Sequence, residues 1–165
     1  MAETVLFLCT GNSARSILAE ALLNAHGAPR FRAFSAGSQP VGRVNPFAIE
    51  ILTRQGHAVE GLSSKSWDRF AETGAPRLDV VITVCGNAAE EKCPVWHGAP
   101  VHAHWGHSDP AAVDGSDADK RAAFFSVYQQ IETRILRFLG LNWAALDNDQ
   151  RAQALAEIAN DGLPA

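Results

Sequence analysis

The sequence has none of the patterns that mark membrane, fibrous or disordered proteins. Its 165 residues include no apolar run of membrane-spanning length, no glycine at every third position and no heptad array. No low-complexity tract of the kind that stays disordered occurs either. Because 47% of the residues are apolar and 19% are charged, we expect one compact globular domain.

Basic residues are also few. The chain has 14 Lys and Arg residues against 18 Asp and Glu residues, a net charge of -4 and an isoelectric point near 5.8. A nucleic-acid partner calls for a basic surface, so we expect no nucleic-acid binding. Any anion that the protein binds must therefore be held at a local site.

Cysteines and cofactor motifs are scarce. Only three cysteines are present, and an odd count does not suit a framework of structural disulfides. The first letters, MAETVLFLCTGN, include no basic leader and favour a strand over a signal peptide. We therefore expect a cytoplasmic protein with reduced thiols and no membrane association. Since no glycine-rich dinucleotide fingerprint occurs, we expect no organic cofactor.

What the sequence does contain is an alternation of strands and helices. The apolar pattern predicts strands over residues 4–8, 31–35, 79–84 and 100–104. It predicts helices over residues 13–26 and 147–160, one that begins at Asn45-Pro46 and stops at Gly56, and one that Ser116 caps with Asp119 and Gly140 ends. This alternation implies an α/β fold with a parallel sheet and helices on both faces. We assign residues 1–140 to this domain and residues 141–165 to a C-terminal helical extension that packs on it or trails it.

Reactive side chains follow three of the predicted strands. Cys9 comes just after the first strand, Cys85 just after the third, and the pair Asp109-Pro110 lies in the loop after the fourth. In an open parallel sheet, ligands bind beyond the carboxyl ends of the strands. The sequence therefore predicts a site at this edge of the sheet.

Residues 9–16 read CTGNSARS, which is a cysteine, five residues, an arginine and a serine between a strand and a helix. Five intervening residues let backbone N–H groups surround a tetrahedral oxyanion, and the following helix presents its positive end to the same ligand. Gly11 permits the tight turn, and the Arg15 guanidinium can hold two ligand oxygens. The same field is expected to lower the pKa of the nucleophile Cys9, to whose sulfur Ser16 can donate a hydrogen bond. The predicted oxyanion-binding residues are Thr10, Gly11, Asn12, Ser13, Ala14, Arg15 and Ser16.

These residues resemble a known family. CTGNSARS, with the Asp-Pro pair after the last strand, is similar to the low-molecular-weight protein tyrosine phosphatases and, within that fold, to the thiol-coupled arsenate reductases. Further motifs that carry the resemblance are FLCTGNSARSILAE, SAG at residues 35–37, VNPFAIE, VCGNAAEEKCP and HWGHSDPA. The resemblance covers the chain from Val5 to about Phe138 and implies a four-stranded sheet in the order 2-1-3-4.

The resemblance also implies a thiol relay. In it Cys9 attacks arsenate, Cys85 attacks Cys9 to release arsenite, and Cys93 attacks Cys85 to leave a Cys85–Cys93 disulfide. Asp109 is the implied general acid for the departing arsenic oxygen. A thioredoxin-like protein, or glutaredoxin with a small thiol, then reduces the disulfide, and phosphate and sulfate compete with arsenate. Seven residues separate Cys85 from Cys93, one more than in the best-known thioredoxin-coupled members, and residues 88–92 among them are predicted to be helical.

Two alternatives stay open at this point. A tyrosine phosphatase needs one thiolate and water, but family phosphatases carry tyrosines after the Asp-Pro pair, where this chain has Ala111, Ala112 and Val113. A zinc-binding or redox-sensing module without turnover would use cysteines and histidines that are close in sequence. Those residues are Cys85, Cys93, His97, His102, His104 and His107, in a spacing that matches no tight zinc pattern.

A last set of residues concerns support of the loop. Some arsenate reductases of the resembled family hold this loop with a potassium ion. The matching ligand positions here are Asn12, Glu20 and Ser35, whereas Lys65 stands where those members have an aspartate. A cation site with a lysine in its wall rejects a metal, so we expect no bound metal. We expect the Lys65 ammonium to lie near Asn12 and Glu20 and to supply the positive charge instead.

Overall fold

The computed structural model describes residues 2–86 and 96–162 of the chain. Its centre is a sheet of four strands: β1 (Glu3–Leu8), β2 (Phe31–Ala36), β3 (Val80–Thr83) and β4 (Val101–His104). All pairings are parallel and the order is β2-β1-β3-β4, which confirms the predicted order. Since the strands are parallel, their carboxyl ends share one edge, beyond which Cys9, Cys85 and Asp109 follow.

The α-helices in the described ranges are α1 (Arg15–Gly27), α2 (Pro46–Arg54), α4 (Asp117–Leu139) and α5 (Asn148–Ala159). Their ends follow local signals in the sequence. The Asn45 side chain accepts a hydrogen bond from Phe47 N at the start of α2, and the capping box predicted for Ser116 and Asp119 is present at the start of α4. The predicted helix over residues 88–92 lies outside the described residues.

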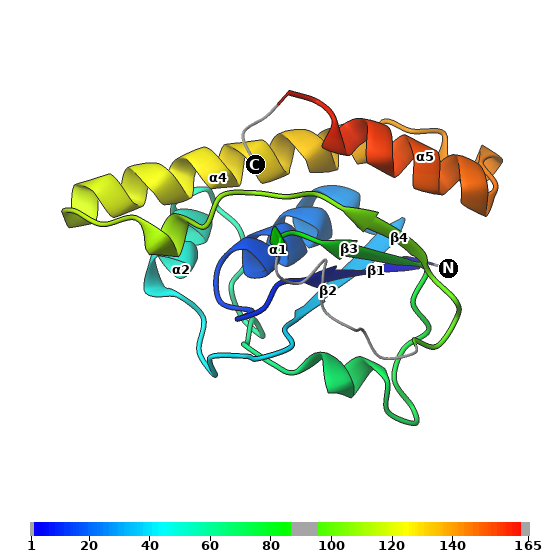
Figure 1. Ribbon diagram of the computed structural model, residues 1–165, viewed down its shortest axis with the longest axis horizontal. Helices are drawn as coiled ribbons and strands as arrows, with labels where there is room; N and C mark the ends of the chain where they lie inside the picture. Colours follow the sequence, from blue (N-terminus) through cyan, green and yellow to red (C-terminus); the bar gives the residue numbers. More distant parts are fainter. Residues whose placement is uncertain (1, 87–95, 163–165) are drawn as a thin grey trace.

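Both faces of the sheet are buried, and β1 shows how. Its residues alternate, so that Val5 and Phe7 pack toward α1, α4 and α5, whereas Leu6 and Leu8 pack toward the opposite face. That opposite face is covered, in the described part of the chain, by the short 3-10 helix η1 (Trp67–Phe70) and its flanking loops. Figure 1 shows the sheet between these layers, with α4 and α5 on one side and η1 on the other.

The C-terminal extension joins the main core. After η3 (Trp143–Ala145), helix α5 lies beside α4 (Figure 1) and buries Leu155 and Ile158 in the same apolar cluster as β1. The indole Nε1 of Trp105, which follows β4, donates a hydrogen bond to Leu155 O at 3.0 Å. The extension therefore packs on the domain, while a domain boundary at residue 140 stays a prediction. None of the helices in the described ranges has both the length and the apolar character needed to cross a membrane.

Candidate active site

The predicted anion loop, residues 9–16, connects β1 to α1 at the carboxyl edge of the sheet. A cavity of about 180 Å³ lies against it, lined by Cys9, Gly11, Asn12, Ser13, Ala14, Arg15, Val41, Asp109 and Ala111. Ala14 precedes the first turn of α1 and provides no side-chain cap for it. The first N–H groups of α1 therefore have no side-chain acceptor from Ala14, and the N-terminus of a helix left in this way suits a bound anion.

The loop residue in the left-handed region is Asn12 and not Gly11. Asn12 has a φ of 45°, a conformation that asparagine tolerates. Its buried side chain donates from Nδ2 to Ser16 Oγ at 2.8 Å and accepts at Oδ1 from Lys65 N at 2.9 Å. These side-chain hydrogen bonds hold Asn12 in that conformation, and the turn expected at Gly11 stays a prediction. Ser16 is bound to Asn12, and no bond from Ser16 to Cys9 is found among the described residues.

The segment after β2 closes over the loop. Gln39 N donates to Thr10 O and Val41 N donates to Gly11 O, each at 3.0 Å. Gly37 packs so closely that a Cβ added there would lie 2.4 Å from Thr10 O. The SAG motif therefore has a steric reason, since only glycine fits where two backbones touch. Thr10 is not among the residues that line the cavity, and its N–H donates to Cys85 Sγ at 3.3 Å.

Arg15, the first residue of α1, is held at the mouth of the loop. Its Nη1 donates to His107 O at 2.9 Å, and its Nη2 lies 3.6 Å from Asp109 Oδ2. Among the described residues, its buried Nε has no hydrogen-bond partner. A buried N–H group without an acceptor is costly, and an oxyanion in the cavity would satisfy it.

Asp109, the expected general acid, lies in the lining of the cavity. It precedes η2 (Pro110–Ala112), and its Oδ1 accepts a hydrogen bond from Ala111 N at 3.0 Å. Its other oxygen, Oδ2, faces Arg15, and the side chain is 41% exposed. Asp109 thus both forms a turn with Pro110 and lines the cavity.

Two of the three cysteines meet at the base of the cavity. Cys9 and Cys85 are buried free thiols, and their side chains share a hydrogen bond. This bond is the main cause that raises the pKa of Cys9 above its ordinary value, and burial raises it further, whereas Arg15 lowers it. The expectation of a lowered pKa is therefore wrong for this arrangement, because it counted the positive groups around Cys9 but not the effect of the Cys85 thiol and of burial. Cys93 lies outside the described residues.

Polar groups support the loop on one flank. Ser35 Oγ donates to Glu20 Oε1 at 2.5 Å, and Lys65 Nζ lies 3.9 Å from the same oxygen. Nζ also donates to Ser63 O at 2.6 Å. The Lys65 and Glu20 side chains are each only 11% exposed. The ammonium thus lies beside Glu20, and the Lys65 backbone is tied to Asn12; its role in the loop stays a prediction.

Charged groups also support the loop on its other flank, and these groups were not predicted from the sequence. Arg134 of α4 donates from Nη1 to Gly106 O at 2.8 Å and lies 3.1 Å from His107 Nε2. Its Nε and Nη2 bind the two carboxylate oxygens of Asp161, beyond α5, at 3.0 and 3.2 Å. Because His107 O accepts from Arg15, this network reaches the anion loop. One signal was available, since Arg134 interrupts the apolar stripe of the helix between Ile131 and Ile135.

Comparison with known proteins identifies the family of the chain. Residues 4–152 match the family model of the low molecular weight phosphotyrosine protein phosphatases. The chain belongs to that family. This confirms the predicted family, and Asp161 lies beyond the matched residues.

Several similar proteins are arsenate reductases. The chain is 38% identical to an arsenate reductase of Bacillus licheniformis over 136 residues, which are 82% of this chain and 94% of that one. The structure of an arsenate reductase from Archaeoglobus fulgidus superposes with a TM-score of 0.64 and 29% identity over 83% of this chain and 99% of that one. A thioredoxin-dependent arsenate reductase of Corynebacterium glutamicum superposes with a TM-score of 0.59 and 27% identity over 82% of this chain and 59% of that one.

Three of the four histidines proposed for a zinc module have other partners in this fold. His104 Nδ1 binds Thr83 Oγ1 at 2.7 Å, His97 Nε2 binds Glu72 O at 3.0 Å, and His107 binds Arg134. Among the described residues they form no group that could hold a metal ion. Nothing in the described part of the chain therefore favours the zinc module.

Proposed function

We propose that this protein reduces arsenate to arsenite through a relay of Cys9, Cys85 and Cys93. The observation that carries the proposal is the Cys85 thiol, which hydrogen-bonds Cys9 and accepts from Thr10 N at the base of the anion loop. Hydrolysis of a phosphate ester needs one thiolate and water. Two-electron reduction needs a second thiol within reach of the first, and the contact between Cys85 and Cys9 supports that role for Cys85.

The first step forms a bond between Cys9 Sγ and arsenic. The loop N–H groups and the Arg15 guanidinium hold the arsenate oxygens, and the unpartnered Nε of Arg15 gains an acceptor. Because Cys85 and burial raise the pKa of Cys9, its proton must pass to a base in the site, and an arsenate dianion is such a base. Asp109 gives a second proton, so that one arsenic oxygen leaves as water.

The next two steps are thiol exchanges. Cys85 thiolate attacks Cys9 Sγ, so an S–S bond forms, the S–As bond breaks and its electron pair stays on arsenic, which leaves as arsenite. Cys93 thiolate then attacks Cys85 Sγ, forms the Cys85–Cys93 disulfide and frees the Cys9 thiolate. A reduced dithiol from a thioredoxin-like protein, or glutaredoxin with a small thiol, returns the two electrons. Such donors are found in a reducing compartment, and we place the protein in the cytoplasm.

The residues around the loop do not fit a potassium ion. Lys65 Nζ lies within 3.9 Å of the Glu20 carboxylate that would have to hold the cation. Like charges repel at this distance, so the ammonium and a metal ion cannot share the position. We propose that Lys65, with Asn12, Glu20 and Ser35, stiffens the loop without a metal.

The lining of the cavity argues against a tyrosine phosphatase. The side chains that flank Asp109 at the mouth are Val41 and Ala111, and the described lining includes no aromatic residue. A phosphotyrosine ring would have no aromatic wall to stack on. Phosphate, sulfate and arsenate, which are small tetrahedral anions, suit this lining better.

The deciding experiment measures arsenite formation and aryl-phosphate hydrolysis in parallel, with thioredoxin or glutaredoxin and glutathione as the donor. Cys9→Ser should lose both activities, because a serine hydroxyl is not ionised near neutral pH. Arg15→Lys should lose most of both, since a lysine cannot make the two-pronged contact. Cys85→Ser should release no arsenite and keep aryl-phosphate hydrolysis, since water can resolve the phosphocysteine.

Cys93→Ser should allow one turnover and leave a Cys9–Cys85 disulfide that mass spectrometry detects. The unmodified protein should show a Cys85–Cys93 disulfide after arsenate treatment. Repeated turnover by Cys85→Ser would exclude the relay. Hydrolysis of aryl phosphates with no arsenite from any donor would favour the phosphatase instead.

A further inference from the structure

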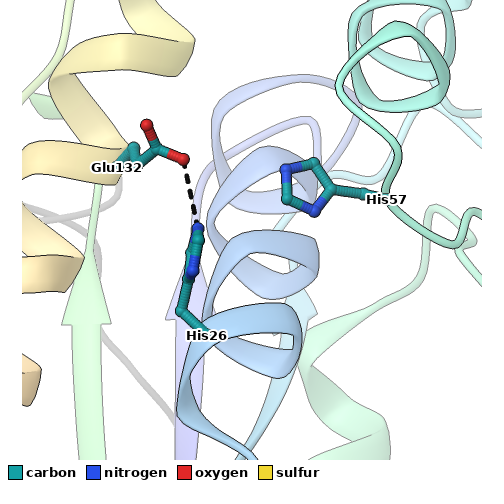
Figure 2. Close-up of side chains that lie close together, drawn as sticks. All are labelled: His26, His57 and Glu132. Atoms are coloured by element: carbon teal, nitrogen blue, oxygen red, sulfur yellow. Dashed lines mark hydrogen bonds and ion pairs between the residues drawn. The ribbon is translucent and has the colours of Figure 1, made fainter.

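A second group of possible ligands lies at the opposite end of α1 from the anion loop. His26 in the last turn of α1, His57 just after α2 and Glu132 on α4 come from three separate elements, as Figure 2 shows. One ligand atom from each lies within 4.8 Å of the other two. At about 1.5 Å per helical residue, His26 is ~16 Å along α1 from Arg15. The group is therefore separate from the catalytic thiols.

The side chains already contact one another. His26 Nε2 lies 3.1 Å from Glu132 Oε2, the interaction drawn in Figure 2. The Tyr128 hydroxyl donates to Glu132 Oε2 at 3.3 Å and lies 2.5 Å from His57 Nε2. The Tyr128 hydroxyl thus contacts both the Glu132 carboxylate and the His57 imidazole. Hydrogen bonds of this kind hold ligands in place around a metal ion.

We propose that His26, His57 and Glu132 bind one divalent transition-metal ion, of which zinc is the best fit, with water as the fourth ligand. Two imidazoles and a carboxylate are a usual ligand set for zinc, with metal–ligand distances of about 2.0–2.2 Å. Ligand atoms of one tetrahedral ion then lie about 3.3–3.6 Å from each other. The His26–Glu132 spacing of 3.1 Å is close to this value, and separations of up to 4.8 Å reach it after side-chain shifts of about 1–1.5 Å.

Solvent access also suits the site. The His26 and Glu132 side chains are 33% and 31% exposed, so an ion can reach them from solvent. A bound ion would tie α1, the end of α2 and α4 together.

The test is zinc titration of the reduced, chelator-treated full chain by calorimetry and by thermal melting. The variants are His26→Gln and Glu132→Gln, which change one exposed ligand each, and the matched control is His102→Gln, an exposed imidazole on β4. In the unmodified protein and the control we expect one zinc site that raises Tm. In both ligand variants we expect its affinity to fall at least ~10-fold, as changes around metal sites typically do.

Zinc also binds thiolates, so a cobalt spectrum locates the ion. The proposed ligands contain no sulfur, and cobalt bound to them gives visible d–d bands without a thiolate charge-transfer band. The proposal fails if His26→Gln and Glu132→Gln bind zinc as the unmodified protein does. It also fails if the only bound cobalt shows thiolate charge transfer, since the ion is then at the cysteines.

Discussion

Two buried ion pairs flank the anion loop, and they differ in how tightly they are paired. On one flank Lys65 Nζ lies 3.9 Å from Glu20 Oε1. On the other, Arg134 makes two short bonds to Asp161, at 3.0 and 3.2 Å, between side chains that are 3% and 1% exposed. The first pair is loose and the second is a two-pronged clamp.

This difference in pairing indicates that the two ion pairs have different roles beside the loop. Burial raises the pKa of Glu20 and lowers the pKa of Lys65, although each group opposes the other's shift. With a separation of 3.9 Å, the Lys65 flank is the looser of the two. The Arg134 flank anchors the backbone at Gly106 and His107, and through His107 O it fixes Arg15. We interpret the extension that carries Asp161 as an anchor for the active-site arginine.

The largest effect is expected at the clamp. Arg134→Ala leaves the buried Asp161 carboxylate without its two-pronged partner, which should lower the free energy of unfolding by about 3–5 kcal/mol. The measurement is urea unfolding followed by circular dichroism. Arg137→Ala is the matched control, because Arg137 binds the same carboxylate from a side chain that is 47% exposed. It should cost no more than ~1 kcal/mol. Equal losses in the two variants would show that Arg134 is no anchor.

The next effect concerns pH. Burial, and then Arg134, lower the pKa of His107 to about 4. As the pH falls, the His107 imidazole therefore takes up a proton near pH 6.5 in the unfolded chain, but only near pH 4 in the folded chain. The free energy of unfolding should fall by up to ~3 kcal/mol as the pH drops from about 6.5 to 4, because protonation favours the unfolded chain over this range. In His107→Gln this part of the pH dependence should vanish. The same slope in both proteins, measured by urea unfolding at several pH values, would contradict the shift.

A smaller effect is expected on the Lys65 flank at Gly37, whose N–H donates to Lys65 O. A Cβ there would lie 2.4 Å from Thr10 O and 2.8 Å from Cys9 O, so Gly37→Ala must displace the anion loop. We expect a loss of about 1–3 kcal/mol in stability, together with lower activity. The control is Gly11→Ala, where the new Cβ meets Val41 at 3.4 Å. That variant should stay within about 0.5 kcal/mol of the parent.

The smallest effect is expected for potassium, which should change neither the activity nor the Tm of the protein. Because Lys65 supplies the positive charge beside Glu20, activity and Tm should be equal in sodium and potassium salts at matched ionic strength. Lys65→Asp should create a potassium dependence, since a carboxylate in that position attracts a cation. A potassium-specific gain in the unmodified protein would mean that the Lys65 flank does hold a metal ion.

Local patterns in the sequence predicted much of this. Strand ends, helix caps and the placement of Cys9 and Arg15 all depend on residues within a few positions of each other, which periodicity and spacing reveal. The order of the sheet came from resemblance. The turn at Asn12 was missed because its conformation is held by the backbone of Lys65, a contact between residues that are 53 positions apart.

The sequence by itself determined that an α/β fold would bring an oxyanion loop, an arginine and a carboxylate to one edge of a parallel sheet. Only the tertiary structure decided the state of the site. It placed the Cys85 thiol against Thr10, 75 positions away, and against Cys9, and the hydrogen bond between the two thiols raises the pKa of Cys9. It also joined Arg134 to Asp161 behind Arg15. Contacts of this kind depend on how distant segments pack and on which charges burial brings together, and no local pattern records either.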